Sequence, residues 1–556
     1  MPKGRDIFFR YLEHHGVEFL FGNPGTTELP LVDGCNDHPT VRYVMSLHED
    51  IAVAMAMGYA RASGKPGVVN LHVAPGLGHG MGNLYNAFRA GIPLIVTAGQ
   101  QHTKLIIHDP ILTADLDEMA RPFTKWAYEV RFVEELPTVM QRAFKEAMTP
   151  PTGPVFVSLP MDVLLDPVEF EIPIGHSEIA DTIAEPDAVR RAASILVAAK
   201  SPMIVAGDGV GLACAWDEVA NIAEALGAPV YTEQYATLWN FPSDHPHYAG
   251  PMPNQAVAMR QRFEGIDVAL LAGFTAQAPV ARFDDKGSLI PPSVRIVAVH
   301  DRPWEIGKNQ PVAAGLPGSI RRNLGALRDA VATGGSRSDT AARSGRLRAA
   351  STKRRAGWTE QAERARTSGK LTAALVAAEL AAVFPRDGVL VDEAISNREA
   401  FVNQVAFADP KAYFAGKGLS LGYSVGAAAG LKLATPERPV VTVVGDGSLL
   451  YYPQALWSLA QLDLPTVTVV LNNASYRVLK LIVGRMGGPW NDAKQALPGL
   501  DFETPRVDFA AMARAMGLEG ERVAKTAELR PALERAFAAK RPYVVDVMLD
   551  QPGEDV

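Results

Sequence analysis

The chain has 556 residues, of which 47% are hydrophobic and 21% charged, and its formal net charge is −7. A length of this order corresponds to about three or four domains, and the globular composition excludes disorder, collagen-like repeats or a coiled coil as the main architecture. The mildly acidic balance gives no indication of a nucleic-acid partner. The two cysteines, Cys35 and Cys214, match neither a disulfide framework nor a zinc-binding spacing, which favours a reducing cytoplasm.

No targeting or membrane segment is predicted. Residues 1–21 mix charged with apolar residues and lack the continuous apolar stretch of a secretory signal. The longest apolar runs, such as Val440–Val444, are far shorter than the ~18–20 residues that a membrane-spanning helix needs. We therefore expect a cytoplasmic protein without a membrane partner.

Three stretches of the chain repeat one alternation of short β-rich runs, glycine turns and alanine-rich helical segments. This alternation predicts an α/β protein with three doubly wound, largely parallel sheets. The expected units are a first domain at 1–166, a middle domain at 180–334, a linker at 335–370 and a third domain at 371–556. The predicted strands are Gly67–Leu71, Pro93–Ala98, Pro154–Leu159, Pro202–Ala206, Val268–Ala272, Arg295–Val299, Val389–Asp392, Val440–Val444, Thr466–Leu471 and Tyr543–Met548.

The expected linker is rich in glycine, serine, alanine and basic residues. No aromatic stacking platform or known nucleic-acid-binding module accompanies the basic residues, so a solvated linker with some helix is favoured over a nucleic-acid patch. The basic residues are Arg337, Arg343, Arg346, Arg348, Lys353, Arg354 and Arg355.

The strongest local signal is the segment Gly445–Ser448, which reads Gly-Asp-Gly-Ser and directly follows a predicted strand. Twenty-four residues separate Gly447 from the pair Asn472–Asn473, which follows the next predicted strand, Thr466–Leu471. Because ligands bind beyond the carboxyl ends of strands in open α/β sheets, we expect both segments at one binding edge.

The side chains at this edge indicate a metal-bound phosphate ligand. Asp446 and Asn473 offer hard oxygen atoms of the kind that Mg²⁺ prefers, and a phosphate would complete the coordination. The glycines allow a diphosphate to approach the backbone, and a helix expected near Ser448 would present free N–H groups to an anion.

This Gly-Asp-Gly and Asn-Asn spacing resembles the thiamine diphosphate signature of the decarboxylase and carboligase superfamily. The resemblance extends along nearly the whole chain and fits benzoylformate decarboxylases best. It implies pyrimidine-binding, middle and diphosphate-binding domains, thiamine diphosphate and Mg²⁺ as cofactors, and a homotetramer with active sites between two subunits. The segments that carry it elsewhere are Phe21–Gly25, Glu28–Pro30, Asn70–His72, Pro93–Gln101 and Lys125–Trp126.

The resemblance assigns Glu49 to the carboxylate that contacts N1′ of the cofactor. Glu49 opens an apolar segment, where a carboxylate at a helix start would bond strongly to a protonated ring nitrogen. From the residues alone, a carboxylate serving the helix dipole remains an alternative, and it suits Asp50 equally well.

His72 matches the family's active-site histidine and would transfer protons during the reaction. It closes a predicted strand and precedes what we expect to be a glycine-rich turn, Pro75–Gly78. Thr26 stands where the family has a serine that contacts the substrate carboxylate. Three further histidines of the first domain are expected in loops: His79, His102 and His108.

The resemblance also implies further cofactor and substrate contacts. Leu421 aligns with the bulky residue that supports the cofactor in its bent form, although an ordinary core position is an alternative. The metal ligands are Asp446, Asn473 and the backbone carbonyl of Ser475. The other cofactor contacts are Asn23, Pro24, Gly25, Asp392, Ser396, Gly445, Gly447, Ser448 and Tyr476, and the substrate pocket is lined by Ile111, Leu112, Val478, Leu479 and Ile482.

Several segments depart from the family pattern. The family's second active-site histidine has no counterpart in the middle-domain stretch Gln277–Phe283, where either Arg282 substitutes electrostatically or the role is absent. The stretch Gly484–Gln495 looks longer than expected and would cap the pocket. The turn Gly207–Gly211 misplaces the last glycine of a dinucleotide-binding pattern, so we interpret it as structural.

The favoured function is non-oxidative decarboxylation of an aryl 2-oxo acid, through the cofactor's ylid, to the aldehyde and CO₂. The alternative enzyme is a carboligase or lyase, similar to acetolactate synthase or to 2-hydroxyacyl-CoA lyase, which would also act on small 2-oxo acids or aldehydes. An inactive cofactor-binding protein is disfavoured, because Glu49, His72, Asp446 and Asn473 are all present.

Overall fold

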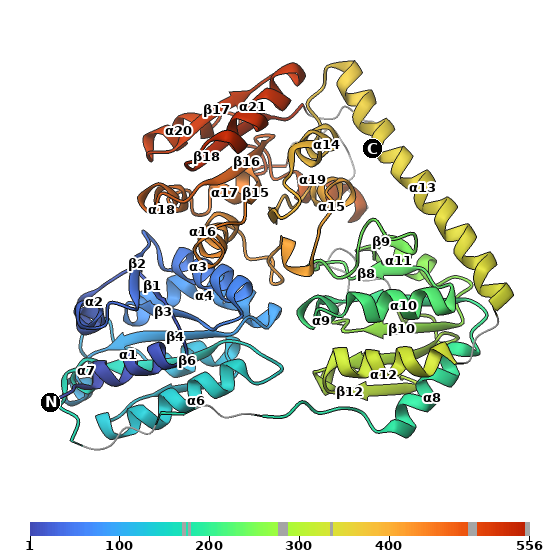
Figure 1. Ribbon diagram of the computed structural model, residues 1–556. Helices are drawn as coiled ribbons and strands as arrows, with labels where there is room; N and C mark the ends of the chain where they lie inside the picture. The colour runs from blue at the N-terminus through green and yellow to red at the C-terminus, as the bar shows by residue number, and fades with distance from the viewer. Residues whose placement is uncertain (170–173, 176–178, 276–286, 334–336, 487–496, 551–556) are drawn as a thin grey trace.

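The computed structural model describes residues 1–169, 174–175, 179–275, 287–333, 337–486 and 497–550. These residues form three α/β blocks, each built around a six-stranded sheet (Figure 1). Every strand pair within the three sheets is parallel. The predicted fold class of three doubly wound parallel sheets is therefore confirmed.

The first sheet has the strand order β2-β1-β3-β4-β6-β5. Its strands are β1 (Phe19–Gly22), β2 (Arg42–Met45), β3 (Gly67–Leu71), β4 (Leu94–Gln100), β5 (Ala127–Glu129) and β6 (Val155–Pro160). Its helices are α1 (Gly4–His14), η1 (Thr26–Glu28), α2 (Leu29–Asp37), α3 (Glu49–Ser63), α4 (Val73–Ala90), η2 (Thr103–His108), α5 (Leu116–Ala120), η3 (Arg121–Phe123), η4 (Val133–Glu135), α6 (Leu136–Met148) and α7 (Met161–Leu165).

The middle sheet has the order β12-β11-β10-β7-β8-β9. Its strands are β7 (Pro202–Ala206), β8 (Val230–Thr232), β9 (Tyr248–Pro251), β10 (Val268–Ala272), β11 (Arg295–His300) and β12 (Ala314–Pro317). Its helices are α8 (Pro186–Val197), α9 (Asp208–Leu212), α10 (Trp216–Leu226), α11 (Ala256–Arg262), η5 (Pro303–Glu305) and α12 (Ile320–Ala332).

The third sheet has the order β14-β13-β15-β16-β18-β17. Its strands are β13 (Val389–Glu393), β14 (Tyr413–Phe414), β15 (Val440–Gly445), β16 (Thr466–Asn472), β17 (Glu519–Val523) and β18 (Tyr543–Met548). Its helices are α14 (Ala373–Val383), α15 (Arg398–Gln404), η6 (Pro410–Ala412), α16 (Ser424–Ala434), α17 (Asp446–Leu449), α18 (Ala455–Gln461), α19 (Arg477–Met486), α20 (Phe509–Ala515) and α21 (Thr526–Ala538).

The strands predicted from the sequence form the inner part of each sheet. Helices cover both faces of such strands, so they consist of nearly continuous β-branched and apolar residues, and β3, β10 and β16 are buried at every position. The strands that the sequence did not predict are short and lie toward the sheet edges, as β2, β5 and β14 do.

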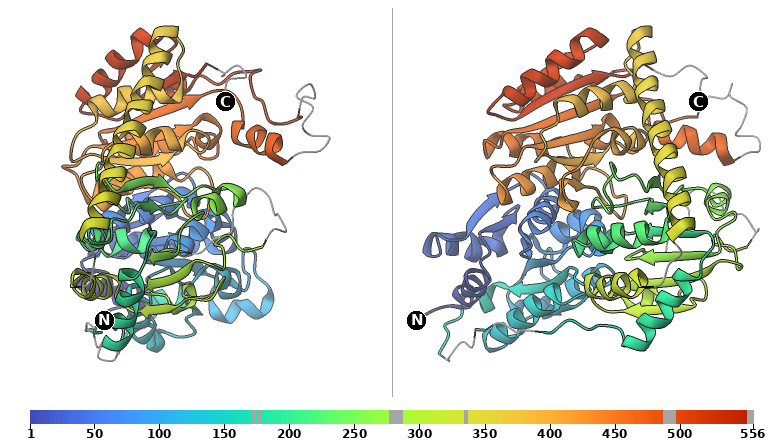
Figure 2. Two further views of the ribbon diagram at one scale, coloured as in Figure 1. Left: turned by 90° about the vertical axis from the view of Figure 1, so that its right-hand side faces the viewer. Right: turned by 45° about the vertical axis from the view of Figure 1, so that its right-hand side comes forward.

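The predicted linker contains one long helix, α13 (Arg337–Ser368), which runs along the outside of the molecule from the middle to the third domain (Figures 1 and 2). Its arginines bind main-chain carbonyl groups of the middle domain. Arg343 donates to the carbonyl of Leu226 at 2.7 Å, and Arg354 donates to the carbonyl of Tyr248. Part of the basic character of this segment therefore fastens the helix to its own chain.

The first and third domains meet where α3 packs along α16. Glycines make the close approach of these two helices possible. A Cβ atom on Gly58 would lie 2.1 Å from the carbonyl oxygen of Ala427, and one on Gly430 would lie 1.9 Å from that of Met55. Since Glu49 begins α3, this contact fixes the position of Glu49 relative to the third domain.

Within the described residues, no helix has both the length and the apolar composition of a membrane-spanning segment.

Candidate active site

Glu49 lies at the start of α3, as the sequence predicted for a carboxylate at a helix start. Its side chain is buried, and its oxygens lie 3.0 Å from Nδ1 of His79 and 3.5 Å from Nδ2 of Asn23. His48 caps the helix, because its Nδ1 accepts from the backbone N–H of Asp50 at 3.1 Å. Burial lowers the pKa of His48, which favours the neutral imidazole that this cap needs.

The glycine-rich segment after His72 is a helix, so the predicted turn at Pro75–Gly78 is wrong. The segment forms the first turns of α4, where Pro75 is the third residue and needs no hydrogen-bonded N–H. A Cβ atom on Gly76 would lie 3.3 Å from Glu49 Oε1 and 3.2 Å from His72 Cβ. The glycine therefore serves the close packing of α4 against the site and not a change of chain direction.

This helix also corrects the expectation that His79 lies in a loop. His79 belongs to α4 and points its Nδ1 at Glu49. His102, by contrast, lies before η2, and His108 ends that short 3₁₀ helix. His79 follows His72 by seven residues, or about two helical turns, so in a helix both side chains lie on the same face. This spacing could have indicated that His79 faces the site if the helix had been predicted.

His72 is held by a second buried carboxylate. Its Nδ1 lies 2.7 Å from Glu28 Oε2, and Glu28 is completely buried. The other oxygen of Glu28 accepts from the backbone N–H of Gly99 at 3.0 Å and from the hydroxyl of Thr27 at 2.7 Å. A carboxylate at Nδ1 favours the tautomer with its hydrogen on Nδ1 and leaves Nε2 for a reacting molecule.

Gly25 makes room for this imidazole. A Cβ atom on Gly25 would lie 2.0 Å from His72 Nδ1, so any larger residue would displace the ring. No role was predicted for Glu28 from the sequence, although it lies within a segment that carries the family resemblance. The signal available for it was an acidic residue three positions after a glycine that the active site requires.

His48, Glu49 and His79 also form the group of described residues whose ligand atoms lie within 4.8 Å of one another, as in a metal site. The direct contact between His79 and Glu49 accounts for this grouping. The ring of His48 lies 4.7 Å from that of Tyr452, which follows α17 in the third domain. The first-sheet edge that carries Glu49 and His72, called the acid–base edge below, is therefore in contact with the third domain.

Asp446 and the asparagine pair come together at the carboxyl edge of the third sheet, as predicted. Oδ1 of Asp446 accepts from the backbone N–H of Gly447 at 2.7 Å. Its Oδ2 accepts from the N–H groups of Asn473, at 2.8 Å, and Ala474. Burial raises the pKa of Asp446 to about 6.

The donor set at this edge fits Mg²⁺ and a diphosphate. Asp446 supplies a carboxylate and Asn473 an amide oxygen, which accepts from the backbone N–H of Ser475 at 3.0 Å. Hard oxygen ligands without sulfur or imidazole suit Mg²⁺ better than zinc or copper. Gly447 has no room for a side chain, because a Cβ atom there would lie 2.6 Å from the ring of Tyr476.

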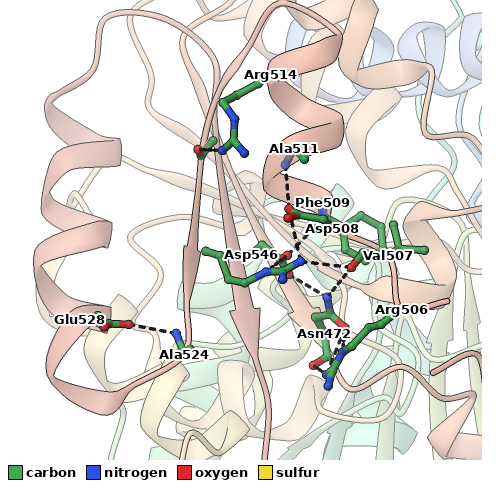
Figure 3. Close-up of polar contacts among 12 residues, drawn as sticks. Asn472, Arg506, Val507, Asp508, Phe509, Ala511, Arg514, Ala524, Glu528 and Asp546 are labelled. Carbon is green, nitrogen blue, oxygen red and sulfur yellow. Dashed lines mark hydrogen bonds and ion pairs between the residues drawn. The ribbon is translucent and has the colours of Figure 1, made fainter. Parts of the chain in front are cut away.

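The third-sheet edge that carries Asp446 and Asn473 is called the metal edge below. A polar network behind it holds the first asparagine of the pair (Figure 3). Asn472 donates from Nδ2 to the buried carboxylate of Asp546 at 2.9 Å, and Arg506 donates to the carbonyl of Asn472 at 3.1 Å. Asp546 also accepts from Arg522 at 3.2 Å and from the backbone N–H of Phe509 at 3.2 Å. Asn472 thus fixes the end of β16, from which Asn473 follows.

The remaining predicted cofactor contacts differ in their accessibility. Asp392 is fully buried, and its oxygens accept from the backbone N–H of Ala394 at 2.9 Å and from the hydroxyl of Tyr413 at 2.7 Å. Ser396 and Leu421 are half-buried in the turns that follow β13 and precede α16. Asn23 and Gly25 are half-buried, Ser448 is buried, and Pro24 and Thr26 are exposed at the acid–base edge.

The predicted substrate-pocket residues lie on two separate segments. Ile111 is 82% exposed, and Leu112 packs partly against the core of the first domain. Val478, Leu479 and Ile482 lie on α19, which stands out from the body of the third domain in Figure 2. The stretch around Arg282, Gln277–Phe283, lies outside the described residues, as does most of Gly484–Gln495.

Comparison with known proteins places three family models along the chain. They are the N-terminal thiamine pyrophosphate-binding domain at residues 2–119, the central domain of thiamine pyrophosphate enzymes at 189–327, and their C-terminal binding domain at 396–547.

Similar proteins match over nearly the whole chain. Benzoylformate decarboxylase of Pseudomonas aeruginosa is 33% identical over 549 residues, which cover 97% of both chains. The large subunit of acetolactate synthase isozyme 3 of Escherichia coli is 28% identical and covers 99% of this chain and 95% of its own. The structure of a 4-hydroxybenzoylformate decarboxylase of Rhodococcus jostii has a TM-score of 0.86, with 28% identity and 99% coverage of both chains.

The family models, the sequence identity and the shared fold agree with the geometry of the two edges. The chain belongs to the thiamine diphosphate-dependent enzymes, in the group of 2-oxo acid decarboxylases that includes benzoylformate decarboxylase.

Proposed function

We propose that the protein decarboxylates an aryl 2-oxo acid of the benzoylformate type, without oxidation, to the aldehyde and CO₂. The observation that carries this proposal is the pair of half-buried His72 and buried Glu28 beside Glu49. It provides an oriented acid–base group next to a carboxylate on one sheet edge. The similarity to two aryl-acting decarboxylases supports the aryl side chain of the substrate.

In this proposal, Mg²⁺ is held by the carboxylate of Asp446, the side-chain oxygen of Asn473 and the carbonyl of Ser475. Thiamine diphosphate supplies, when bound, a nucleophilic carbon and an electron sink for decarboxylation. The diphosphate would lie against Gly445, Gly447 and Ser448. The hydrogen bonds that Asp446 already accepts from the backbone support a rigid edge for that ligand.

The acid–base steps belong to the first domain. Glu49 would accept a hydrogen bond from the pyrimidine nitrogen of the bound cofactor and so would hold a proton on that atom. His72 delivers and removes protons through Nε2, because Glu28 occupies Nδ1. The exposed hydroxyl of Thr26 contacts the substrate carboxylate.

We further propose that the active site lies between two subunits of a cytoplasmic homotetramer. Three large apolar side chains around η2 support a protein surface there, since they are largely exposed in the single chain: Leu105, Ile107 and Ile111. Leu112, Val478, Leu479 and Ile482 would complete the substrate pocket across that interface.

The test is aldehyde release from benzoylformate with added thiamine diphosphate and Mg²⁺, coupled to NADH oxidation by an alcohol dehydrogenase. We expect turnover with benzoylformate and much weaker turnover with pyruvate. Absence of turnover by a protein that binds the cofactor would reject the aryl decarboxylase.

The second candidate is a carboligase similar to acetolactate synthase. The match to acetolactate synthase over 99% of the chain favours this alternative over an unrelated lyase. Formation of acetolactate from pyruvate, measured in the same preparation, would identify it.

A further inference from the structure

Four buried charged side chains lie close enough to interact electrostatically where the three domains of the chain adjoin. Arg61 comes from α3 of the first domain, Asp208 and Glu233 from the middle domain, and Lys417 from the loop before α16. Their two positive and two negative charges balance, which a buried ionic cluster requires. We call these residues the junction cluster.

Lys417 is the centre of the junction cluster. Its Nζ lies 2.9 Å from Oδ2 of Asp208 and contacts Oε1 of Glu233, and all three side chains are almost completely buried. Burial by itself raises the pKa of Asp208, but Lys417 and Thr237 more than offset this, so the pKa of Asp208 lies below its usual value. Asp208 therefore remains a carboxylate that binds the ammonium group.

The middle domain holds Asp208 rigidly. Its oxygens also accept from the backbone N–H of Thr237 at 2.8 Å, from the hydroxyl of Thr237 at 2.9 Å and from Asn240 at 3.2 Å. A Cβ atom on Gly207 would lie 2.2 Å from the carbonyl of Gly273. The segment Gly207–Gly211, which the sequence predicted as a turn, opens helix α9 and is filled by protein, and its aspartate faces the third domain.

The loop at 415–423 is fixed at two further points. Asn86 of the first domain accepts from the N–H of Ser420 at 3.2 Å and donates to its carbonyl at 2.9 Å. The buried carboxylate of Glu393 accepts from the N–H groups of Gly422 and Ser424. Leu421 lies between these two anchor points, and Lys417 provides the third.

The loop needs these anchors because its conformation is strained and crowded. Leu419 has a φ of 60°, in the left-handed region that a leucine rarely adopts. A Cβ atom on Gly418 would lie 2.6 Å from the ring of Tyr85. Contacts from outside the loop must therefore maintain this conformation.

We propose that Asp208, Glu233 and Lys417 are positioning residues for the cofactor. By fixing the loop at 415–423, the middle domain sets the position of Leu421, against which the bent cofactor rests. This inference rests on the proposed function through the role of Leu421. The middle domain then contributes to cofactor binding without touching the cofactor.

The test compares two double variants of the full-length protein. Lys417→Met/Glu233→Gln, the tether variant, removes the ion pairs that join the loop at 415–423 to the middle domain. It removes one positive and one negative charge, so the net charge of the junction cluster is unchanged. The matched control is Arg321→Met/Glu218→Gln. It removes an ion pair of 3.1 Å between α12 and α10 in the same domain, away from the loop. The single variant Asp208→Asn is the second probe if the first double variant does not fold.

Three quantities are measured: the Kd of thiamine diphosphate with Mg²⁺ by calorimetry, amide hydrogen exchange of residues 415–423 without cofactor, and the apo melting temperature. We expect the tether variant to raise the Kd roughly 10–100-fold, as loss of outer positioning contacts commonly does. Amide exchange in the loop should rise with it, while the control variant matches the wild type in both.

An unchanged Kd and unchanged loop exchange in a folded tether variant would overturn the inference. A lower melting temperature of this variant with a wild-type Kd would show that the junction cluster only stabilises the contact between domains. That result would also overturn the inference. If the wild type itself binds no thiamine diphosphate, the proposed function fails. The exchange data then still decide whether the junction cluster fixes the loop.

Discussion

The two functional edges of this chain differ in how complete they are. At the third-sheet edge, Asp446 is buried and accepts three backbone N–H groups, so its position is fixed by the chain itself. At the first-sheet edge, His72 has a buried partner in Glu28, but the partner of Glu49, His79, is exposed. The surrounding apolar side chains are exposed as well: Ile107 is 85% exposed and Ile111 is 82% exposed.

This difference separates two kinds of preorganisation. The metal edge is built from backbone groups and strand ends within one sheet, so it exists before any ligand or partner arrives. At the acid–base edge, the proposed proton-transfer groups are oriented by their hydrogen-bond partners, while large apolar side chains beside them are exposed in the single chain. The comparison predicts that changes at the metal edge alter cofactor affinity, whereas changes at the acid–base edge alter turnover with affinity largely kept.

The largest effect is expected from Glu49→Gln. Glutamine cannot hold a proton against the pyrimidine nitrogen, so we expect kcat to fall roughly 10²–10⁴-fold, the usual range for lost acid–base catalysis. The measurements are kcat for aldehyde release and the Kd of thiamine diphosphate. Glu18→Gln, which breaks an exposed ion pair with Lys65, is the control.

If Glu49 serves only the helix dipole, its loss changes stability by about 0.3–1 kcal/mol and leaves kcat near that of the wild type. That result would show that Glu49 has no part in catalysis, and the proposed difference between the two edges would not hold.

The next largest effect is expected from Asp446→Asn, on affinity. Both oxygens of Asp446 accept from backbone N–H groups, and the NH₂ group of an asparagine would replace one of these acceptors by a donor. The asparagine also lacks the negative charge that favours Mg²⁺ binding. We expect the Kd of Mg²⁺ and thiamine diphosphate to rise about 10–100-fold. Calorimetry measures this, with Asp409→Asn as a control that alters the start of η6 and an ion pair with Arg438 in the same domain.

A Kd equal to that of the wild type, in a folded Asp446→Asn protein, would contradict the assignment of the metal edge. A loss confined to kcat would show that the two edges are not divided between affinity and turnover.

A smaller effect is expected from Glu28→Gln. The glutamine can present its NH₂ group to Nδ1 of His72, which favours the opposite tautomer and leaves a hydrogen on Nε2. We expect kcat to fall about 10-fold or more, while the Kd of thiamine diphosphate stays within about 2-fold. A rise in Kd without a fall in kcat would show that Glu28 supports the binding surface and does not orient His72.

The core of the fold could be predicted because its signals are local. β3, β7, β10 and β18 have the predicted bounds, since long β-branched runs covered on both faces have no other stable arrangement. Short edge strands such as β14 gave no such signal, because two residues fit many loops equally well.

The site divides in the same way. Asp446 and Asn473 follow buried strands directly, so their meeting at one edge follows from the parallel sheet. Glu28 and Lys417 act through partners 44 and 209 residues away in the chain, His72 and Asp208, and no local pattern indicates such pairs. The helix α4 was missed because its glycines are typical of a turn, whereas Gly76 allows close packing against Glu49.

The smallest effect tests whether the third-sheet edge is preorganised in the apo protein. Preorganisation buries carboxyl groups there, and ionising a buried carboxyl group at neutral pH lowers the free energy of unfolding. Burial raises the pKa of Glu393 to about 7, from an ordinary value of 4.5. Between these values the folded chain keeps a proton that the unfolded chain has lost, so the apo protein should lose stability as the pH rises from 4.5 to 7. The loss from this one group should be on the order of 3 kcal/mol and complete above pH 7.

Glu393→Gln should remove that share of the pH dependence. The measurement is the apo unfolding free energy of both proteins at pH 5, 6, 7 and 8. The difference between them isolates Glu393 from Asp50, whose pKa burial also raises to about 7. Parallel curves would show that Glu393 stays ionised when folded, stabilised by the N–H groups of Gly422 and Ser424. In that case the third-sheet edge would be preorganised without the loss of unfolding free energy that burial of Glu393 predicts.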